Sequence, residues 1–212
     1  MENKDLLNEK QSEDSSLGFG SIKDRLKELD VGGLIKNLDE IAFTSHIKCV
    51  VPISGGKDSQ SCLKLALERF NKDEVLGVFC DTNYEHPYTY SHVDKMRSLY
   101  GVQIVHINDG GVYERIKKYG RFPSDIARFC TDELKIRTAK IFYTNLAKAQ
   151  GKGFEVWYGM RLGESYQRSE RYKGKNEDDL YAPDTIMVGK YPKYLAKQGV
   201  MFRLPILKWE VS

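Results

Sequence analysis

The sequence predicts an α/β fold, with a mostly parallel sheet covered by helices on both faces and preceded by a helical arm. Four short apolar runs have the composition of buried strands, and they lie at residues 47–53, 75–80, 102–107 and 154–158. The segments between them repeat apolar residues at helical spacing, and strands that alternate with helices form parallel βαβ units. Ligands bind beyond the carboxyl ends of such strands, so the loops after these runs are the places to look for a site.

Residues 1–45 are predicted to form an N-terminal arm, and residues 46–212 the domain that contains the sheet. The first part of the arm is polar, and we expect it to be partly disordered. Two short apolar stripes follow on either side of Gly32 and Gly33, and they predict a helical hairpin. We expect this hairpin to pack on the core or on a second subunit, which makes the arm a candidate homodimer contact.

The helices of the main domain are predicted from their apolar faces and their ends. One face of the first helix carries Leu63, Ala66, Leu67 and Phe70. Pro87 and Gly101 bound the second helix, and a longer helix is expected at residues 132–149. Residues 172–203 are rich in Tyr, Lys and Gly, and we expect them to be irregular or hairpin-like and to act as a lid.

Composition and charge exclude some classes of protein. The chain is 41% hydrophobic and 30% charged, which is ordinary for a globular domain. It has no long apolar run, and its start lacks the basic segment followed by an apolar segment that is typical of a signal peptide. These features predict a cytoplasmic protein without a membrane partner. Residues 1–45 hold 6 Lys and Arg against 10 Asp and Glu, which leaves 27 against 20 in the remainder. A basic body favours an anionic ligand.

The cysteines are spread along the chain without a C-x-x-C pair, so neither a zinc site nor a disulfide framework is expected. They are Cys49, Cys62, Cys80 and Cys130. The first three lie in apolar stretches and are expected in the core. Arg128 lies close to Cys130, and a helix is expected to begin near Asp132; both features favour a thiolate. Cys130 is therefore a candidate sulfur carrier, with a buried structural thiol as the alternative.

The strongest candidate site is the loop between the first strand and the first helix. Its residues are Ser54, Gly55, Gly56, Lys57, Asp58 and Ser59. Two adjacent glycines let the backbone approach an anion, Lys57 adds charge, the serines add hydroxyl donors and the next helix offers unpaired N–H groups. The Walker A pattern is excluded, because Val51 stands at its first glycine and Asp58 follows Lys57. A plain strand-to-helix turn is the alternative.

Polar residues also follow the second and fourth strands. Asp81 can accept hydrogen bonds from ribose hydroxyls or hold Mg²⁺ through water, and capping of the next turn is the alternative. Arg161 and Arg168 can make bidentate contacts to phosphate or sulfate, and Glu164 can orient one of them. Surface salt bridges are the alternative interpretation of these three charges.

Basic residues near these motifs predict a second anion site that faces the loop. Residues 161–175 contain 5 Lys and Arg against 2 Asp and Glu, and Arg128, Lys135 and Arg137 precede them. Two anion sites suit a substrate with phosphates at both ends, or a nucleotide together with a nucleic-acid strand.

Four motifs carry a resemblance to a known family. SGGKDS, residues 54–59, resembles the PP-loop of the ATP pyrophosphatase superfamily. DTNYEHP, residues 81–87, is similar to the D-T-G-x-E-x-P segment of phosphoadenosine-phosphosulfate (PAPS) reductase-like proteins; Asn83 replaces its glycine but tolerates left-handed angles. GMRLGESYQR, residues 159–168, resembles the G-x-R-x-x-E-S-x-x-R of the same family. RFCTDELKI, residues 128–136, is similar to a segment of members from phages and DNA phosphorothioation systems.

The resemblance covers about residues 46–170, and LPILKW at residues 204–209 shows a weaker similarity. Relatives often continue into a further helix after this segment. We therefore expect a short or C-terminally truncated member. The resemblance implies a Rossmann-like sheet of the adenine nucleotide alpha hydrolase type. It also implies an adenine nucleotide, ATP or PAPS, accompanied by Mg²⁺.

The resemblance further implies roles for individual residues. The residues expected to bind the nucleotide and its phosphates are Ser54, Gly55, Gly56, Lys57, Asp58, Ser59, Asp81, Arg161, Glu164 and Arg168. Lys57, Arg161 and Cys130 are expected to take part in the chemistry, and Asp81 to hold a metal through water. Adenylylsulfate reductases hold an iron–sulfur cluster with paired cysteines, and here Phe129 stands beside Cys130, so no such cluster is expected.

Three functions remain open at this point. The first is a PP-loop enzyme in which an acceptor oxygen attacks the α-phosphorus of ATP and pyrophosphate leaves. Such an enzyme would serve sulfur transfer or nucleic-acid modification, and its partner would be a nucleic acid or a sulfur-donor protein. The second is a sulfonucleotide reductase without its C-terminal cysteine tail, since no cysteine follows Cys130. The third is a non-catalytic nucleotide-binding module whose acidic arm docks a partner.

Overall fold

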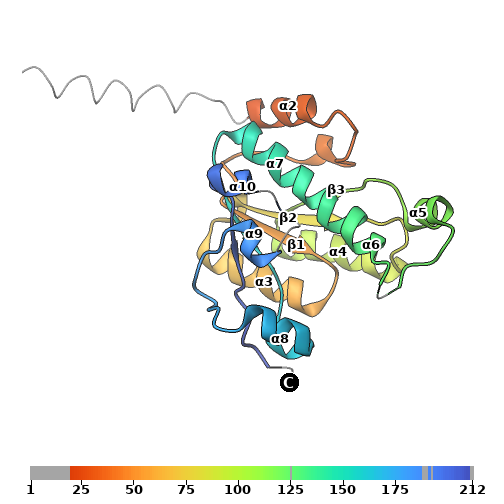
Figure 1. Ribbon diagram of the computed structural model, residues 1–212. Helices are drawn as coiled ribbons and strands as arrows, with labels where there is room; N and C mark the ends of the chain where they lie inside the picture. The colour runs from red at the N-terminus through yellow and green to blue at the C-terminus, as the bar shows by residue number, and fades with distance from the viewer. Residues whose placement is uncertain (1–19, 125, 188–190, 192, 211–212) are drawn as a thin grey trace, which may run out of the picture.

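The computed structural model describes residues 20–124, 126–187, 191 and 193–210 (Figure 1). The disorder predicted for the start of the arm concerns residues outside this part of the chain. Across these described ranges, no helix is both long enough and apolar enough to cross a lipid bilayer.

The core of the molecule is a sheet of five strands, and every neighbouring pair in it is parallel. Their order across the sheet is β3-β2-β1-β4-β5. The strands are β1 (Cys49–Ile53), β2 (Val75–Cys80), β3 (Gln103–Ile107), β4 (Glu155–Trp157) and β5 (Met201–Arg203). The predicted α/β fold is confirmed, and the first four strands lie where the apolar runs predict them.

β1 lies at the centre of the sheet and pairs with β2 on one side and β4 on the other. Val50 of β1 is opposite Leu76 of β2 and Val156 of β4. From β1 the chain continues outward to β2 and β3, then crosses back to β4 and β5. The loops after β1 and β4 therefore leave the sheet at the point where the strand order reverses, which is where open α/β sheets bind ligands.

Helices cover both faces of this sheet (Figure 1). α3 (Lys57–Arg69) and α4 (Pro87–Tyr100) lie on one face. α7 (Thr138–Gln150) lies on the other, with α2 (Gly20–Leu29) packed against it. Alternate residues of β1 point to opposite faces, so that Val50 joins the core beneath α7 and its two neighbours join the core beneath α3. A strand buried on both faces reads as a continuous apolar run, which explains why β1 is easily recognised.

Shorter elements complete the described chain. They are 3₁₀ turns at Leu38–Glu40, Lys72–Glu74 and Leu162–Glu164, α5 (Val112–Tyr119), α6 (Phe129–Thr131), a π-helical turn at Asp132–Arg137, α8 (Tyr166–Tyr172), α9 (Pro183–Ile186) and α10 (Tyr194–Lys197). The long helix predicted from residue 132 thus begins with a π-helical turn, and its α-helical part is α7. π-Helical turns are rare and often occur at functional sites.

The predicted hairpin has one helix, α2, and not two. Asp30 follows α2, and its carboxylate accepts hydrogen bonds from the backbone N–H groups of Leu34 and Ile35 at 2.8 and 2.9 Å. Ile35 then forms a β-bridge with Ile107 of β3, which draws this segment along the sheet edge. The apolar residues of the second stripe are buried as predicted, but in a turn and an extended segment.

The segment predicted to be irregular, residues 172–203, contains the fifth strand. β5 has three residues, too few to show a period in the sequence. Its Arg203 is 4% exposed and ion-pairs with Glu155 of β4, with Nε 2.9 Å from Oε2. Because this core strand contains a charged residue, the hydrophobic pattern of the sequence does not predict it.

Candidate functional site

The loop after β1 adopts the sharp turn that its glycines predict. Gly55 has a φ of +76°, which is a left-handed conformation that side chains other than glycine rarely adopt. A Cβ at this position would also lie 2.9 Å from Cγ2 of Thr89. Gly56 is extended, with a φ of −92°, and it forms the N-cap of α3. The requirement for glycine is therefore strict at position 55 and weaker at position 56.

The two serines of the loop have different roles. The Ser59 hydroxyl donates to the carbonyl oxygen of Gly56 at 2.8 Å and accepts from the backbone N–H of Ser54 at 3.2 Å. Ser59 is buried, so it fixes the shape of the loop. Ser54 is exposed, and its Oγ lies 3.2 Å from that of Ser59. Of the two hydroxyl groups, the one on Ser54 is open to a ligand.

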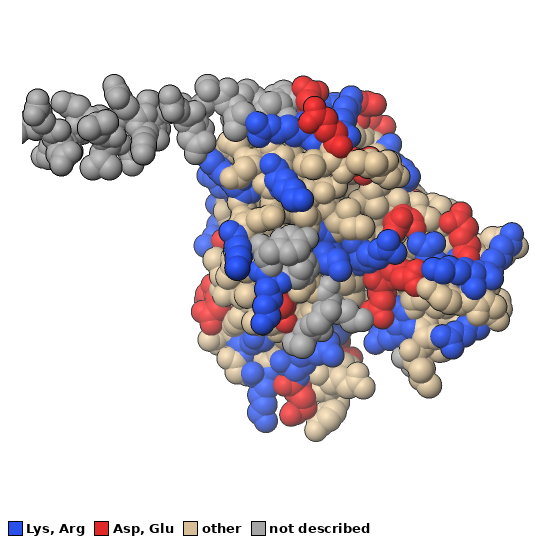
Figure 2. Space-filling model, turned by 45° about the horizontal axis from the view of Figure 1, so that its top comes forward, with Lys and Arg blue, Asp and Glu red and all other residues tan. Residues whose placement is uncertain are grey.

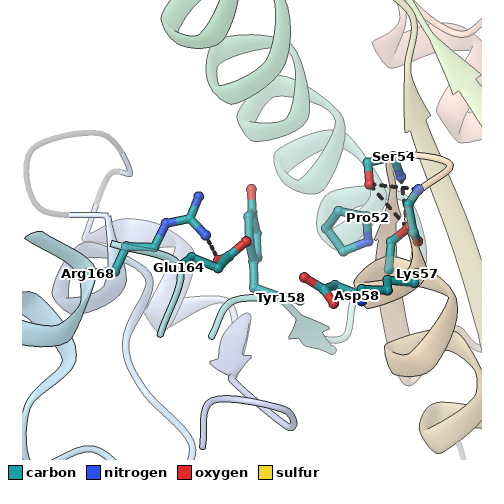
Figure 3. Close-up of a pocket in the computed structure, with 10 residues that line it drawn as sticks. Pro52, Ser54, Lys57, Asp58, Tyr158, Glu164 and Arg168 are labelled. Carbon is teal, nitrogen blue, oxygen red and sulfur yellow. Dashed lines mark hydrogen bonds and ion pairs between the residues drawn. The ribbon is translucent and has the colours of Figure 1, made fainter. Parts of the chain in front are cut away.

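A cavity of about 390 Å³ lies in front of this loop. Figure 3 shows Ser54, Lys57 and Asp58 on one side of it and Glu164 and Arg168 on the other. Lys57 is exposed in the first turn of α3, whose N–H groups have no acceptor within the helix. These N–H groups, the helix dipole and the Lys57 ammonium make this side of the cavity attractive to an anion.

The loop after β4 packs directly on the first turn of α3. A Cβ on Gly159 would lie 3.1 Å from the carbonyl oxygen of Asp58, so a larger residue would require one of these two backbones to shift. Two residues further on, Arg161 Nε donates to Asp58 Oδ2 at 3.0 Å. Arg161 is 8% exposed. The sequence predicts that Arg161 contacts a phosphate, and the structure places it in an ion pair with the loop itself.

Glu164 joins the two arginines of this segment. Its Oε2 accepts a hydrogen bond from the backbone N–H of Arg161 at 3.3 Å and forms an ion pair with Nη1 of Arg168. Ser165 caps α8 by accepting from the backbone N–H of Arg168 at 3.3 Å. Glu164 therefore holds the Arg168 guanidinium at the rim of the cavity, opposite Lys57.

Two further cavities continue from the first. An apolar cavity of about 360 Å³ shares Pro52, Ser54, Tyr158 and Gly159 with it. A more polar hollow of about 590 Å³ is lined by Arg128, Arg168 and Arg171 and also by Asp132 and Glu164. We call it the basic hollow, because its arginines outnumber its carboxylates. Arg168 lines all three cavities, so it stands where they meet.

The apolar cavity contains functional candidates that the sequence analysis missed. Tyr158 directly precedes the GMRLGESYQR motif, Met160 lies within it, and Glu85 lies within the DTNYEHP segment. Lys135 lines the same cavity, and its Nζ is 3.6 Å from Oε1 of Glu85. Burial raises the pKa of Tyr158 to about 12. The positions of Met160 and Glu85 inside the recognised motifs, and of Tyr158 directly before one, could have indicated them.

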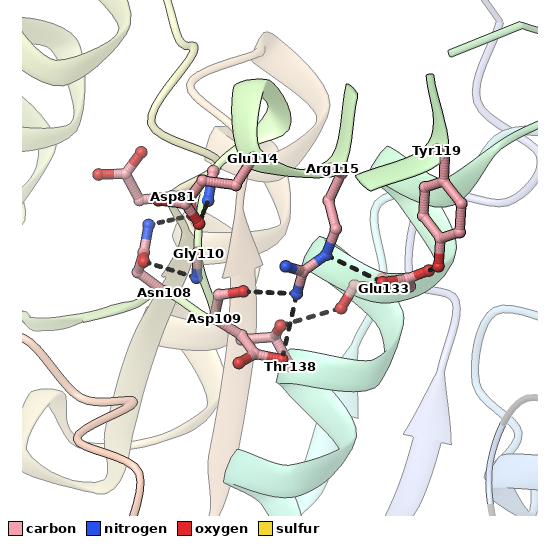
Figure 4. A network of polar contacts seen from close by, with 10 residues as sticks. Asp81, Asn108, Asp109, Gly110, Glu114, Arg115, Tyr119, Glu133 and Thr138 are labelled. Carbon is pink, nitrogen blue, oxygen red and sulfur yellow. Dashed lines mark hydrogen bonds and ion pairs between the residues drawn. The ribbon is translucent and has the colours of Figure 1, made fainter. Parts of the chain in front are cut away.

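Asp81 is engaged through both its backbone and its side chain. Figure 4 shows Asn108 beside it, whose Nδ2 donates to the Asp81 carbonyl oxygen at 2.9 Å. Its Oδ1 accepts from the backbone N–H of Asn83 at 2.8 Å and from the hydroxyl of Tyr90 at 2.7 Å. Burial, and then this hydrogen bond, raise the pKa of Tyr90 to about 12. Asn83 has a φ of +55°, so the predicted left-handed turn is confirmed. Asp81 lines none of the three cavities, and its binding of ribose or of metal stays a prediction.

Cys130 lies beside the cavities and not in their walls. It is half-buried in α6, with Sγ 3.9 Å from Oγ1 of Thr131, and Thr131 lines both the apolar cavity and the basic hollow. Burial raises the pKa of Cys62 and of Cys80 to about 12, and that of Cys49 well above its ordinary value. A role of Cys130 as a sulfur carrier stays a prediction.

The predicted second anion site is assembled in part. Arg128 lines the basic hollow with Arg168 and Arg171, whereas Lys135 lines the apolar cavity. Arg137 is exposed and lines none of the three cavities. In the described part of the chain, no group of three or more His, Cys, Asp or Glu side chains is placed to hold a metal ion.

Comparison with known proteins agrees with this geometry. The model of the phosphoadenosine phosphosulfate reductase domain matches residues 48–211. An uncharacterized protein of Methanocaldococcus jannaschii is 32% identical over 141 residues, which are 66% of this chain and 27% of that relative. The chain thus spans about a quarter of this relative. The domain model covers most of this chain, so the chain belongs to the phosphoadenosine phosphosulfate reductase domain family of the PP-loop superfamily. Membership in this family supports a nucleotide-using enzyme at the level of the family.

Proposed function

We propose that the protein is a PP-loop enzyme that binds an adenine nucleotide and transfers part of it, or activates an acceptor with it. The phosphates lie against residues 54–59, and the adenosine lies in the apolar cavity. The observation that carries this proposal is the continuity of the two cavities, which share Pro52, Ser54, Tyr158 and Gly159. An anion receptor that opens into an apolar cavity suits a ligand with one charged end and one flat, apolar end.

The chemistry of each cavity supports this orientation. The first-turn N–H groups of α3, the Ser54 hydroxyl and Lys57 can all donate to phosphate oxygens. In the apolar cavity, Met160 and Tyr158 offer surfaces to an adenine ring, and the Glu85–Lys135 pair offers polar groups to its edge. Arg168 stands at the junction, where the first phosphate of a bound nucleotide would lie.

In the reaction that we propose, an acceptor oxygen attacks the α-phosphorus of ATP. A new P–O bond forms to the acceptor, the bond to the bridging oxygen of the β-phosphate breaks, and pyrophosphate leaves with that electron pair. Such a reaction needs positioning and neutralisation of charge more than covalent help from the protein. Lys57 and the loop amides would hold the leaving pyrophosphate, and Arg168 would lie near the reacting phosphorus.

Mg²⁺ would supply further neutralisation of the phosphates when bound with the nucleotide. Asp58 fits a role as its protein ligand, because its carboxylate lines the loop cavity and points across it (Figure 3). Arg161 holds Oδ2 of this carboxylate at 3.0 Å, which fixes its direction. Asp81 fits this role less well, since Tyr90 and Asn83 already engage its Oδ1.

A sulfonucleotide is the second candidate ligand, and the basic hollow favours it. PAPS carries a phosphate on its ribose in addition to its phosphosulfate. The apolar cavity opens into the basic hollow through Thr131, Ile136, Met160, Arg168 and Met187. The arginines of the hollow could receive the second anionic group of such a ligand.

Two measurements together test the proposal. Release of pyrophosphate from ATP, with and without candidate acceptors, reports the reaction, and calorimetric titration with ATP and with PAPS reports the preferred nucleotide. Pyrophosphate release that is lost in the Lys57→Ala variant supports the proposed enzyme. Binding of ATP without any release supports a non-catalytic module, and a clear preference for PAPS supports the sulfonucleotide alternative. No binding of either nucleotide contradicts the proposal.

A further inference from the structure

We propose that α5 and the loop after it bind single-stranded nucleic acid and direct it into the basic hollow. We call this surface the α5 lobe; it comprises residues 112–124 and 126–128. Part of the inference rests on the proposed function, because the bound strand would be the acceptor in the nucleotide reaction. The binding itself does not depend on that reaction, and it can be tested separately.

The α5 lobe exposes an unusual amount of apolar and aromatic surface. Tyr113 is 63% exposed, Phe122 75% and Ile126 97%. Large apolar side chains that remain in water cost free energy, and several of them within one short segment indicate a surface that a ligand covers. Flat rings of this kind are the platforms on which unpaired bases stack.

Cations are placed directly beside these rings. Nζ of Lys117 lies 4.5 Å from the centre of the Tyr113 ring, and Nζ of Lys118 lies 4.9 Å from that of Tyr119. The described residues of the lobe also include the exposed Arg121 and Arg128, against Glu114, whereas the charge of Arg115 is paired with Glu133. Lys and Arg side chains lie around the outer part of the lobe that carries α5 (Figure 2). A ring with an ammonium group beside it can stack on a base while the ammonium contacts the adjoining phosphate.

The lobe is fixed to the rest of the site by a polar network (Figure 4). Arg115 Nε ion-pairs with Glu133 Oε2 at 2.9 Å, and its Nη2 donates to the carbonyl oxygen of Asp109 at 2.9 Å. The Tyr119 hydroxyl donates to the other oxygen of Glu133. Glu133 belongs to the π-helical turn, so the lobe is held against the element that follows Cys130. A surface that is already rigid loses little entropy when it binds.

The lobe meets the basic hollow at Arg128. Arg128 is its last residue and also lines the hollow, together with Arg168 and Arg171. Arg168 also lines the loop cavity and the apolar cavity. A strand that stacks on Tyr113 and Phe122 and follows these arginines would therefore bring its backbone or its bases to the proposed nucleotide site.

The same features argue against two other occupants. A duplex keeps its bases stacked inside, where Tyr113 and Phe122 cannot reach their faces. A protein partner is disfavoured because lysine is depleted at the centre of protein interfaces, whereas here Lys117 and Lys118 lie against the exposed rings.

The test is fluorescence anisotropy of the full chain with labelled oligonucleotides of about 16 nucleotides, as single-stranded RNA, single-stranded DNA and duplex. Titrations at several salt concentrations, from about 50 to about 200 mM, give the salt dependence. We expect binding of single strands in preference to the duplex. Phe122→Ala should weaken it about fivefold or more, since stacking of one base contributes at least about 1 kcal/mol.

Charge variants give a second and independent readout. The double variant Lys117→Ala/Lys118→Ala should lower the slope of log affinity against log salt by about 1.4, if each lysine neutralises one phosphate. The matched control is Lys72→Ala/Lys152→Ala, which also removes two exposed lysines. These two precede β2 and β4, so they lie near the amino ends of the strands, whereas α5 follows the carboxyl end of β3. The control should leave both affinity and slope unchanged.

The experiments distinguish a failure of nucleic-acid binding by the α5 lobe from a failure of the proposed nucleotide-using function. Lobe variants should keep the ATP affinity of the unchanged protein by calorimetry, which also shows that they fold, and Lys57→Ala should keep oligonucleotide binding. Absence of oligonucleotide binding at low salt overturns the proposal whether or not ATP binds. So does equal weakening by the lobe variant and the control variant, and so does a preference for the duplex.

Discussion

Nε of Arg161 lies 3.0 Å from Oδ2 of Asp58, and this pair joins the loop after β4 to the first turn of α3. The side chain of Arg161 is 10% exposed and that of Asp58 25%. Removing one partner of such a buried pair leaves a charge without compensation, which costs more than the pair itself contributes. The two loops that frame the candidate site therefore depend on each other.

The first prediction follows from this pair. Arg161→Ala should lower the free energy of unfolding by about 2–3 kcal/mol, at the low end for a buried pair because Asp58 is partly exposed. Urea denaturation measures this change. Asp58→Ala should be similar, and the double variant should lose less than the sum of the two. Arg168→Ala is the control, since its side chain is 42% exposed and it should lose under about 1 kcal/mol. Strictly additive losses would contradict the coupling.

The second prediction concerns the two glycines of the loop. Gly55→Ala should destabilise the protein by about 2 kcal/mol and impair nucleotide binding, because position 55 is left-handed and its Cβ would meet Thr89. Gly56→Ala is the matched control and should have a smaller effect, since position 56 is extended and its nearest contact would be Ser54 Oγ at 3.4 Å.

A second substitution separates the two causes at Gly55. Thr89→Ala removes the methyl group that a Cβ would meet, so it should partly rescue Gly55→Ala and leave the cost of the left-handed angle. Thermal denaturation of the single and double variants measures the rescue. Equal effects of alanine at positions 55 and 56 would contradict the described shape of the loop.

The third prediction is a pH dependence that comes from Glu155 and Arg203. Burial alone would raise the pKa of Glu155, but hydrogen bonds from Arg203 and Trp157 outweigh it and hold the pKa below its ordinary value of 4.5. The stabilisation is therefore complete above pH 4.5 and is lost as the pH falls through the lowered pKa. Glu155→Gln should be less stable than the unchanged protein at neutral pH, and this difference should shrink in acid.

Unfolding by urea at neutral pH and at about one pH unit below 4.5 measures this effect. Glu170→Gln is the control, because the side chain of Glu170 is 51% exposed and its removal should change stability by less than about 0.5 kcal/mol at either pH. A difference between Glu155→Gln and the unchanged protein that is independent of pH would contradict the role of the carboxylate charge.

The fourth prediction is that Cys130 is the first cysteine to react with iodoacetamide in the folded protein. Burial raises the pKa of Cys62 and of Cys80 to about 12 and that of Cys49 well above its ordinary value, so these thiols hold very little thiolate near pH 8. Peptide mass spectrometry gives the order of modification. Cys130→Ser should then leave nucleotide binding intact and abolish sulfur transfer if Cys130 is the carrier; unchanged transfer would remove Cys130 from the mechanism.

The sequence predicted those parts of the structure that depend on local patterns. β1 lies in an apolar run that is followed by a pair of glycines, and its end at Ile53 and the turn after it follow from this local composition. The left-handed Asn83 followed from the tolerance of Asn for such angles. The bounds of α4 likewise followed from Pro87 and Gly101.

Features that depend on contacts between distant residues could not be read in this way. Asp58 and Arg161 are 103 positions apart, and nothing in either motif indicates that they pair with each other. In β5, Arg203 ion-pairs with Glu155 of the neighbouring strand, and the sequence alone does not distinguish such a buried arginine from one on the surface. The predicted second helix of the hairpin does not form. The Asp30 carboxylate accepts hydrogen bonds from the backbone N–H groups of Leu34 and Ile35, which gives these groups an alternative to helical hydrogen bonds.

The central claim is that the turn after β1 receives the phosphates of a nucleotide. Calorimetric titration of ATP into the unchanged protein, into Lys57→Ala and into Lys64→Ala tests it most directly. Lys64 is an exposed lysine further along α3, so it controls for loss of one positive charge. We expect Lys57→Ala to weaken ATP binding by about tenfold or more, as for a lost charge-assisted hydrogen bond, and Lys64→Ala to bind as the unchanged protein does. Equal affinities of all three proteins would contradict the claim.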